Sequence, residues 1–325
     1  MRTGFALGIV LALASPTVAW AAEPINPPEP SAALPESTPD DIALFADEGR
    51  RMKIDVIING KGPFPFIVDT GAEETLIARE LVTQLALREG PEKRLHSLGV
   101  SRTVRTAIVA HLAANKMVVK DIVAPAVNRY NLGAAGILGL PALKSQRMLL
   151  DFKAGTMALT PSNVRQENWE GESITVTARN RLGQLILADA SIEGDRVQVI
   201  IDTGNELSVG NEPLRRLLSA RRSGPSSANL PVSLMDVNGD TTSVDSMIVD
   251  KLRIATFGFN NVPIAFADAH IFTVLGLKRT PTLLLGMDVL KLFGRVSIDF
   301  GNRRVRFQTA EAYNVPTAAA ATTRP

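Results

Sequence analysis

Two aspartates, Asp69 and Asp202, each begin an Asp-Thr-Gly tripeptide, and each follows a run of mainly apolar residues, at 64–68 and 197–201. Such runs predict buried strands that deliver both carboxyl groups into tight turns. Two carboxylates a few ångströms apart cannot both ionise, so they hold one proton and titrate as a coupled unit. One can then act as a base toward water while the other hydrogen-bonds a carbonyl group. The sequence leaves open which aspartate has which role.

The residues that follow each aspartate can support these turns. Thr70 and Thr203 carry hydroxyl groups that could bond to the backbone of the opposite half and so lock the two turns together. Gly71 and Gly204 permit a tight backbone geometry and a close approach of the two loops. We therefore expect the two aspartates to be catalytic and these four residues to support the active-site turns.

A second landmark is repeated in the same order along the chain. Ile137-Leu138-Gly139 follows the first tripeptide and Leu284-Leu285-Gly286 follows the second. A turn signal also precedes each apolar run, Asn59-Gly60 in the first half and Glu193-Gly194 in the second. The pattern predicts an internal duplication. We expect an all-β fold with two lobes and an active site between them.

Composition narrows the class of protein. The chain has 325 residues, of which 45% are hydrophobic and 21% charged, as in a soluble protein of two domains. A net charge of +2 gives no indication of nucleic acid as a partner. With no cysteine and three scattered histidines, the sequence offers neither disulfides nor a metal-ligand pattern. We expect no metal and no cofactor.

The N-terminal residues have a pattern that is typical of an export signal. Arg2 precedes an apolar run at residues 5–14, and small residues near Ala21 suit a cleavage site. This predicts a signal peptide at 1–21, a Pro-rich linker at 22–40, and a periplasmic or secreted protein without stable membrane insertion after cleavage. The alternative is an uncleaved signal anchor with the linker as a stalk. The remaining boundaries are expected at 41–160 for the N-terminal lobe, 161–172 for an inter-lobe linker, 173–311 for the C-terminal lobe and 312–325 for a disordered tail.

Each half also carries a possible flap over the catalytic turn. Strand-like stretches flank Gly99 in the first half, and Asn238-Gly239-Asp240 forms a turn signal between two further stretches in the second. We expect Gly99 and Gly239 to lie near bound substrate.

With these motifs in place, the chain resembles the retropepsin-like aspartic proteases, in the exported two-domain form known as the periplasmic aspartic proteases of alphaproteobacteria. Residues 69–76 are similar to the retroviral signature, and residues 137–139 and 285–288 resemble that family's second landmark. The likeness extends over about residues 41–310. It implies two pepsin-type β-barrel lobes, water-mediated endopeptidase activity, and flaps that close over a polypeptide substrate in extended conformation.

Two positions depart from the family pattern. Asn205 stands where the family usually has a small residue, and it could donate to its carboxylate or crowd the site. Ala72 has no hydroxyl group to donate to Asp69, and Glu73 after it could bind substrate main chain or be a solvated turn residue. Ala72, Glu73 and Asn205 are therefore candidate substrate-binding residues.

Two alternatives stay open beside a monomeric enzyme. One is a non-catalytic peptide-binding or scaffold protein on the same fold. The other is a protein in which one lobe forms homodimers with a two-aspartate site and the other lobe is regulatory.

Overall fold

A computed structural model describes residues 51–97, 101–166, 168–221 and 231–309, together with short strands at residues 4–5, 10–11 and 42–43. Apart from these strands, the expected signal peptide, Pro-rich linker and C-terminal tail lie outside the described residues, and so does Gly99. Within the described part of the chain, no helix is long and apolar enough to cross a membrane.

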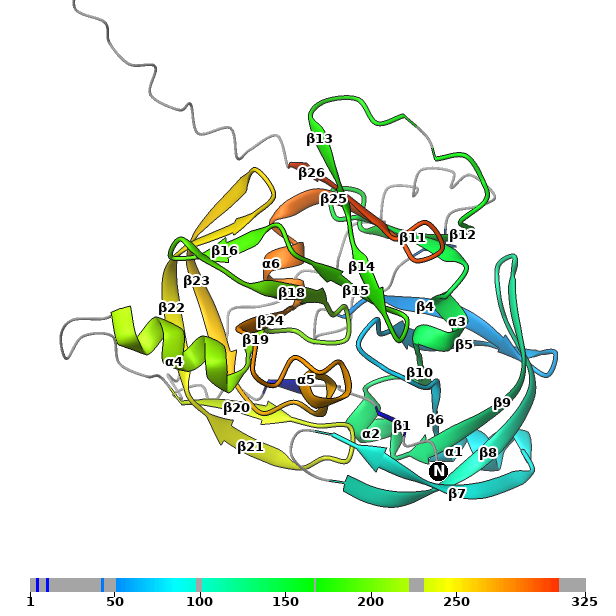
Figure 1. Ribbon diagram of the computed structural model, residues 1–325. Coiled ribbons are helices and arrows are strands. Elements are labelled where there is room, and N and C mark those ends of the chain that lie inside the picture. Colours follow the sequence, from blue (N-terminus) through cyan, green and yellow to red (C-terminus); the bar gives the residue numbers. More distant parts are fainter. Residues whose placement is uncertain are drawn as a thin grey trace, which may run out of the picture.

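The first lobe is a barrel of six strands in the order β8-β4-β5-β10-β6-β9, closed by the pairing of β9 with β8 (Figure 1). In β4 the side chains alternate between buried and exposed, as expected for a strand with one face on a core. Asn59 and Gly60, with φ of 49° and 77°, form the tight turn that leads from β4 into β5. The elements are β4 (Lys53–Ile58), β5 (Lys61–Val68), β6 (Leu76–Ala78), α1 (Arg79–Leu85), β7 (Glu89–His96), β8 (Ser101–Ala114), β9 (Met117–Val127), α2 (Arg129–Leu132), β10 (Gly136–Leu138) and α3 (Leu140–Leu143).

The second lobe repeats this order with one strand divided. The single strand β4 of the first lobe corresponds to two short strands, β15 and β16, of which β15 pairs with β18 and β16 pairs with β22. The remaining pairings follow the first lobe, because β18, β24, β19 and β23 are neighbours in that order. The elements are β14 (Arg179–Arg181), β15 (Gln184–Leu187), β16 (Ala190–Ile192), β17 (Asp195–Arg196), β18 (Gln198–Ile201), β19 (Val209–Gly210), α4 (Glu212–Arg221), β20 (Val232–Met235), β21 (Thr241–Val244), β22 (Ser246–Ile254), β23 (Phe257–Phe266), α5 (His270–Val274), β24 (Thr282–Leu285) and α6 (Met287–Leu290).

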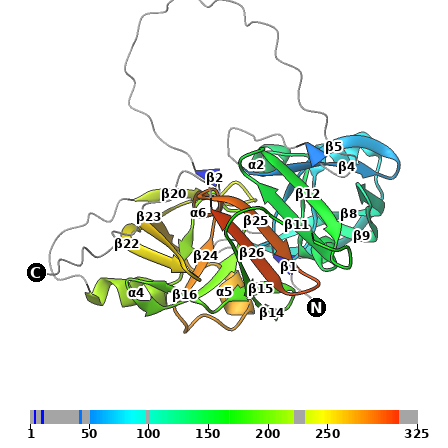
Figure 2. The ribbon, with the colours of Figure 1, turned by 90° about the horizontal axis from the view of Figure 1, so that it is seen from above.

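A third sheet joins the lobes, in the order β13-β26-β25-β11-β12-β3. Its centre is the antiparallel pair β11–β25 (Figure 2). In this pair, Leu149 lies opposite Ser297. The Nε atom of Arg295 on β25 also lies 2.5 Å from Oδ2 of Asp151 on β11. The elements are β3 (Ile42–Ala43), β11 (Gln146–Asp151), β12 (Thr156–Pro161), β13 (Ser173–Thr177), β25 (Phe293–Asp299) and β26 (Arg304–Thr309).

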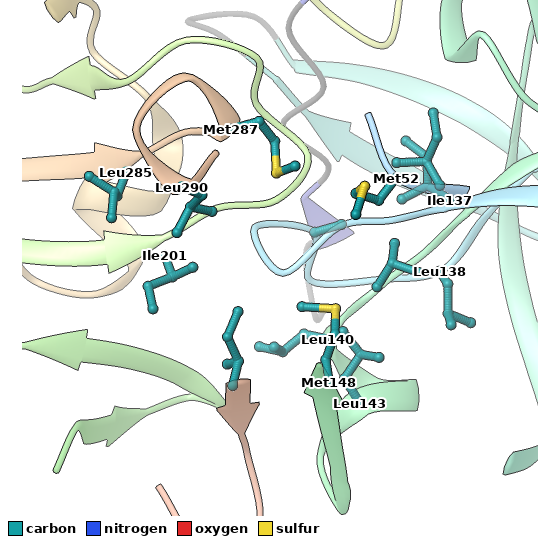
Figure 3. Close-up of a cluster of buried hydrophobic side chains, with 14 of the residues drawn as sticks. Met52, Ile137, Leu138, Leu140, Leu143, Met148, Ile201, Leu285, Met287 and Leu290 are labelled. Carbon is teal, nitrogen blue, oxygen red and sulfur yellow. The ribbon is translucent and has the colours of Figure 1, made fainter. Parts of the chain in front are cut away.

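The hydrophobic core continues from one lobe into the other. A single cluster of buried side chains includes residues of both lobes and of the joining sheet. Figure 3 shows part of it, with the side chains of the two lobes facing one another across the same region. The first lobe contributes Met52, Ile137, Leu138, Leu140 and Leu143, the joining sheet contributes Met148, and the second lobe contributes Ile201, Leu285, Met287 and Leu290.

Two hairpins lie where flaps were expected. In the second lobe, β20 and β21 pair around the turn that contains Gly239, whose φ is +85°. In the first lobe, β7 pairs with β8 on either side of Gly99. Two short N-terminal strands lie against these hairpins: β1 (Gly4–Phe5) pairs in parallel with β7, and β2 (Val10–Leu11) pairs antiparallel with β20.

Candidate active site

Asp69 and Asp202 occupy equivalent positions at the ends of strands β5 and β18. Each of these strands pairs in parallel with the strand of the second landmark, β10 or β24. The amide of Asp69 donates to the carbonyl of Leu138 at 3.1 Å, and the amide of Asp202 donates to the carbonyl of Leu285 at 3.0 Å. The apolar residues before each landmark glycine therefore fix the backbone from which each carboxyl group projects.

The two carboxyl groups meet between the lobes and are fully buried. Oδ1 of Asp69 accepts hydrogen bonds from the amides of Gly71 at 2.7 Å and Ala72 at 3.0 Å. Oδ1 of Asp202 accepts from the amide of Gly204 at 3.0 Å. The two carboxyl groups are also close enough for each to affect the pKa of the other, and two carboxyl groups in such a pair share one proton.

The threonines of the two tripeptides link the lobes by reciprocal hydrogen bonds. Oγ1 of Thr70 donates to the carbonyl of Ile201 at 2.8 Å and accepts from the amide of Thr203 at 3.1 Å. Oγ1 of Thr203 donates to the carbonyl of Val68 at 2.8 Å and accepts from the amide of Thr70 at 3.1 Å. These are the bonds to the opposite half that the sequence predicts, and they hold the two turns in register.

Each tripeptide glycine touches the aspartate of the other lobe. A Cβ atom added to Gly71 would lie 2.5 Å from Oδ2 of Asp202, and one added to Gly204 would overlap the carboxyl group of Asp69. The reason for glycine is therefore the space for the opposite carboxyl group.

Hydroxyl groups on the loops beside the tripeptides complete the support. Oγ1 of Thr75 accepts from the amide of Gly139 at 3.2 Å, and Oγ of Ser208 accepts from the amide of Gly286 at 3.0 Å. Sequence reasoning did not find Thr75 and Ser208. The signal was present, because each hydroxyl residue stands at the same distance along the chain from its own aspartate.

Gln184 is another residue that sequence reasoning missed. Its Nε2 donates to the carbonyl oxygen of Thr70 at 2.6 Å, so a side chain of the second lobe also holds the loop of the first lobe that carries Asp69. No repeated pattern in the sequence marks this residue.

The two lobes differ in how they hold their carboxyl groups. Nδ2 of Asn205 donates to Oδ2 of Asp202 at 2.6 Å, whereas the equivalent residue of the first lobe, Ala72, contributes its backbone amide alone. Oδ2 of Asp69 is buried and receives no hydrogen bond from an amide or hydroxyl donor in the part of the chain that the structure describes. A proton shared by the two carboxyl groups would satisfy it.

The pKa values of both aspartates are displaced upward. Burial raises the pKa of Asp69 to about 6, and the hydrogen bond from Gly71, the bond with Asp202 and the charge of Arg51 act in the opposite direction. Burial and the charge of Asp69 raise the pKa of Asp202 well above its usual range. The pair therefore retains one proton above about pH 6, which is the state that acid–base chemistry by two carboxyl groups needs.

The two hairpins contact each other near their tips. Nδ2 of Asn238 donates to Oγ of Ser97 at 3.0 Å, and Ser97 also bonds to Asp236. Beside them, Nη2 of Arg102 lies 2.6 Å from Oδ1 of Asp240. The hairpins of the first and second lobes are thus in contact with each other.

The structure brings some candidate substrate-binding residues together and leaves others apart. Ala72 and Asn205 lie in the loops that hold the aspartates, and Glu73 follows directly in a half-buried position. Gly239 lies at its hairpin tip, where an added Cβ atom would be 2.8 Å from Nδ2 of Asn131 in the first lobe. Within the described residues, no group of three or more His, Cys, Asp or Glu side chains could hold a metal ion.

A family model described as aspartyl protease matches residues 54–142 and 188–289 of the chain. The protein belongs to the aspartyl protease family. Each matched segment contains one Asp-Thr-Gly tripeptide and one second landmark, which agrees with a duplicated protease of two lobes. The predicted all-β fold of two related lobes is confirmed. A search of curated proteins finds no match.

A second aspartate in each half ends a strand of the joining sheet. Asp151 and Asp299 are the last residues of β11 and β25. Each aspartate accepts hydrogen bonds from backbone amides of the following turn, such as those of Ala154 and Asn302. These bonds give Asp151 and Asp299 a structural role at the strand ends, separate from the pair of buried carboxyl groups.

Proposed function

We propose that the protein is an exported aspartic endopeptidase in which Asp69 and Asp202 activate a water molecule for attack on a peptide bond. The observation that carries the proposal is the pair of fully buried carboxyl groups, one from each lobe, each packed against the tripeptide glycine of the other lobe. Family membership implies aspartic peptidase activity, and the pair provides the groups that this chemistry requires.

The reaction follows from the protonation state of the pair. The ionised carboxyl group takes a proton from water while the oxygen of that water bonds to the carbonyl carbon of the peptide. The protonated carboxyl group gives its proton to the carbonyl oxygen, so a neutral tetrahedral diol forms. The first carboxyl group then returns its proton to the amide nitrogen, the C–N bond breaks, and a hydroxyl proton of the diol returns to the second carboxyl group. Acid and amine products result, and the pair again holds one proton.

An extended polypeptide is the substrate form that the site favours. Both hairpins contain strands that can pair with a further strand: β7 pairs with residues 4–5 of this chain and β20 with residues 10–11. Backbone pairing of this kind is indifferent to side chains, so it suits a protease that binds many sequences in one conformation.

The export part of the proposal rests on the N-terminal sequence. Arg2, the apolar run at 5–14 and the small residues near Ala21 form a signal peptide, with a periplasmic or secreted protein as the outcome. An uncleaved anchor is the alternative, and the N-terminal sequence of the protein recovered from cells distinguishes the two.

The direct test is proteolysis of a denatured test protein by the purified wild type and by Asp69→Asn. We expect the wild type to cut and the variant to be inactive, with unchanged circular dichroism as the control for folding. A wild type that binds peptides without cutting them would instead support the non-catalytic binding protein.

We also propose that the protein is a monomer. The reciprocal threonine bonds and the pairing of β11 with β25 lie within one chain, so its two lobes complete one site. A molecular mass of one chain at dilute concentration, with activity retained, would exclude homodimers built on a single lobe.

A further inference from the structure

A cavity of about 550 Å³ lies between the lobes beside the catalytic loop of Asp69. The first lobe contributes Glu73 and Leu140, and the second contributes Gln184 and residues of α5, including Ile271. Gln184 also bonds to the carbonyl oxygen of Thr70, so the cavity wall is continuous with the loop that carries Asp69. A volume within the range of roughly 300–1,000 Å³ is typical of pockets that bind small groups.

Apolar side chains form much of the wall on both sides. Leu140 and Pro141 lie on the first-lobe side, and Ile271, Val274 and Leu275 lie on the second-lobe side. An aliphatic chain could therefore pass between them with its methylene groups out of water.

Two glutamates in this wall each have a buried carboxylate oxygen without a hydrogen-bond donor among the residues that the structure describes, Oε1 of Glu73 and Oε2 of Glu74. The other oxygen of Glu74, Oε1, lies 2.8 Å from Nζ of Lys93, so the charge of Glu74 is already paired. Among the described residues, no such ion pair is found for Glu73. A buried carboxylate oxygen without a donor is costly, and a ligand that donates to it would remove that cost.

The charges around Glu73 indicate that a ligand group bound to it would be a cation. Burial raises the pKa of Glu73 to about 7, and the negative charge of Glu74 raises it further. Lys93 is engaged by Glu74, and Lys144, an exposed residue, is the lysine among the cavity-lining residues. Uncharged side chains of β15 and α5 face the cavity from the second lobe. A cation inside the cavity would meet an uncompensated carboxyl group.

We propose that this cavity is a substrate subsite that selects a basic side chain, lysine or arginine, with the stem between α3 and α5 and the cationic end on Glu73. The inference rests on the proposed peptidase function and gives it a specificity. It assigns Glu73 to side-chain recognition, in contrast to a contact with substrate main chain, which would be the same for every side chain.

The experiment compares peptides that carry either lysine or norleucine at one position, with that position moved along the peptide on both sides of the cut. Norleucine has the same stem as lysine and lacks the amine. For the wild type at pH 7.5, we expect kcat/KM to be about tenfold or more higher for lysine at one position, which is the gain typical of a hydrogen bond to a charged group. We expect Glu73→Gln to remove most of this preference.

Glu92→Gln is the matched control, because it removes the same charge from an exposed site on β7. We expect it to keep the lysine preference of the wild type. Equal kcat/KM for lysine and norleucine at every position in the wild type would overturn the proposal. An equal loss of rate for both peptides in Glu73→Gln would also overturn it, and would assign Glu73 to the substrate main chain.

The lysine preference should also depend on pH. We express it as kcat/KM for the lysine peptide divided by kcat/KM for the norleucine peptide, because ionisation of the catalytic pair changes both values alike and cancels in the ratio. Lysine stays cationic across the range, whereas Glu73 loses its proton as the pH rises toward and beyond about 7. The ratio should therefore increase between about pH 5 and pH 8 in the wild type and stay flat in Glu73→Gln. A ratio that falls with pH contradicts the assignment.

A binding measurement separates failure of the subsite from failure of the proposed function. Fluorescence anisotropy of the same labelled peptides reports the lysine preference whether or not the peptides are cut. Cutting without any lysine preference would remove the subsite and leave the peptidase. Preferential binding of lysine peptides without cutting would support the subsite and remove the peptidase.

Discussion

The imidazole rings of His96 and His270 are stacked, with centroids 4.2 Å apart and planes inclined by 6°. His96 is the last residue of β7 in the first-lobe hairpin, and His270 is the first residue of α5 in the second lobe. The stack therefore joins a flap to the opposite lobe, close to the contacts between the two hairpin tips.

Acidification should loosen this contact. Burial lowers the pKa of both histidines below 6.5; the charges of His270 and Arg94 lower that of His96 further, and Asp268 acts in the opposite direction on His270. A histidine whose pKa is lowered in the stacked form stabilises that form fully above pH 6.5. This stabilisation is lost as the pH falls from 6.5 through the lowered pKa. We expect the protection of amides in β7 and β20 against hydrogen exchange, measured relative to the intrinsic exchange rate at each pH, to decrease between pH 7 and pH 5.

The variant His96→Phe keeps an aromatic ring and removes the charge, so its exchange should respond less to pH. His111→Gln, at an exposed position on β8, serves as the control and should respond like the wild type. If His96→Phe and the wild type respond alike, the stack has no part in closing the flaps.

The two aspartates should act as one unit. Asp69→Asn and Asp202→Asn each remove a member of the pair that shares a proton, so each should reduce kcat to near the level of the double variant. Single-turnover rates of the three variants on one peptide provide the comparison. Substantial activity in either single variant would show that the reaction does not need a pair that spans the lobes.

The same pair should cost stability at neutral pH. Burial raises the pKa of Asp69 to about 6. The contribution of Asp69 to the free energy of unfolding is therefore fully favourable below the unfolded pKa of about 3.9 and is lost as the pH rises through 6. Asp69→Asn removes this charge, so the variant should gain Tm relative to the wild type at pH 8 and gain little at pH 4. Calorimetry at both pH values tests the sign, and a larger gain at pH 4 would contradict it.

A hydroxyl group at position 72 should shift the pH–rate profile. A serine there could donate to the Asp69 carboxylate, which would favour the charged form and lower its pKa. Ala72→Ser should therefore move the acidic limb of the kcat/KM profile to lower pH, while Ala72→Gly, which also has no hydroxyl group, should leave it near its wild-type position. An acidic limb that stays in place or moves to higher pH would mean that the side chain at position 72 serves packing and does not set the pKa of Asp69.

The tripeptide glycines should tolerate no side chain. An added Cβ at Gly71 would meet the carboxyl group of Asp202 in the other lobe, so Gly71→Ala should separate the pair and reduce kcat strongly. Gly258→Ala is the matched control, because an added Cβ there meets no atom within 4 Å. Wild-type kcat in Gly71→Ala would show that the loops can move apart without loss of function.

Local sequence patterns were sufficient for the parts of the site that are built from strand, turn and repeat. The strands that end at Asp69 and Asp202, the threonine bonds and the hairpin around Gly239 all follow from short motifs. The pairing of β11 with β25, the stack of His96 on His270 and the bond from Gln184 to Thr70 join residues distant in sequence. No periodicity records such contacts, because they depend on how the finished lobes pack together.

The hydrogen bond from Asn205 to Asp202 has no counterpart at Ala72, and this difference makes the two halves of the site unequal. Two identical lobes related by a two-fold axis would bind a peptide equally well from amino to carboxyl end or in reverse. In the present chain the halves on either side of the scissile bond are chemically distinct. A bound polypeptide therefore contacts one surface with the residues on the amino-terminal side of the scissile bond and a different surface with those on the carboxyl-terminal side. The site can thus distinguish the two directions in which a chain could bind.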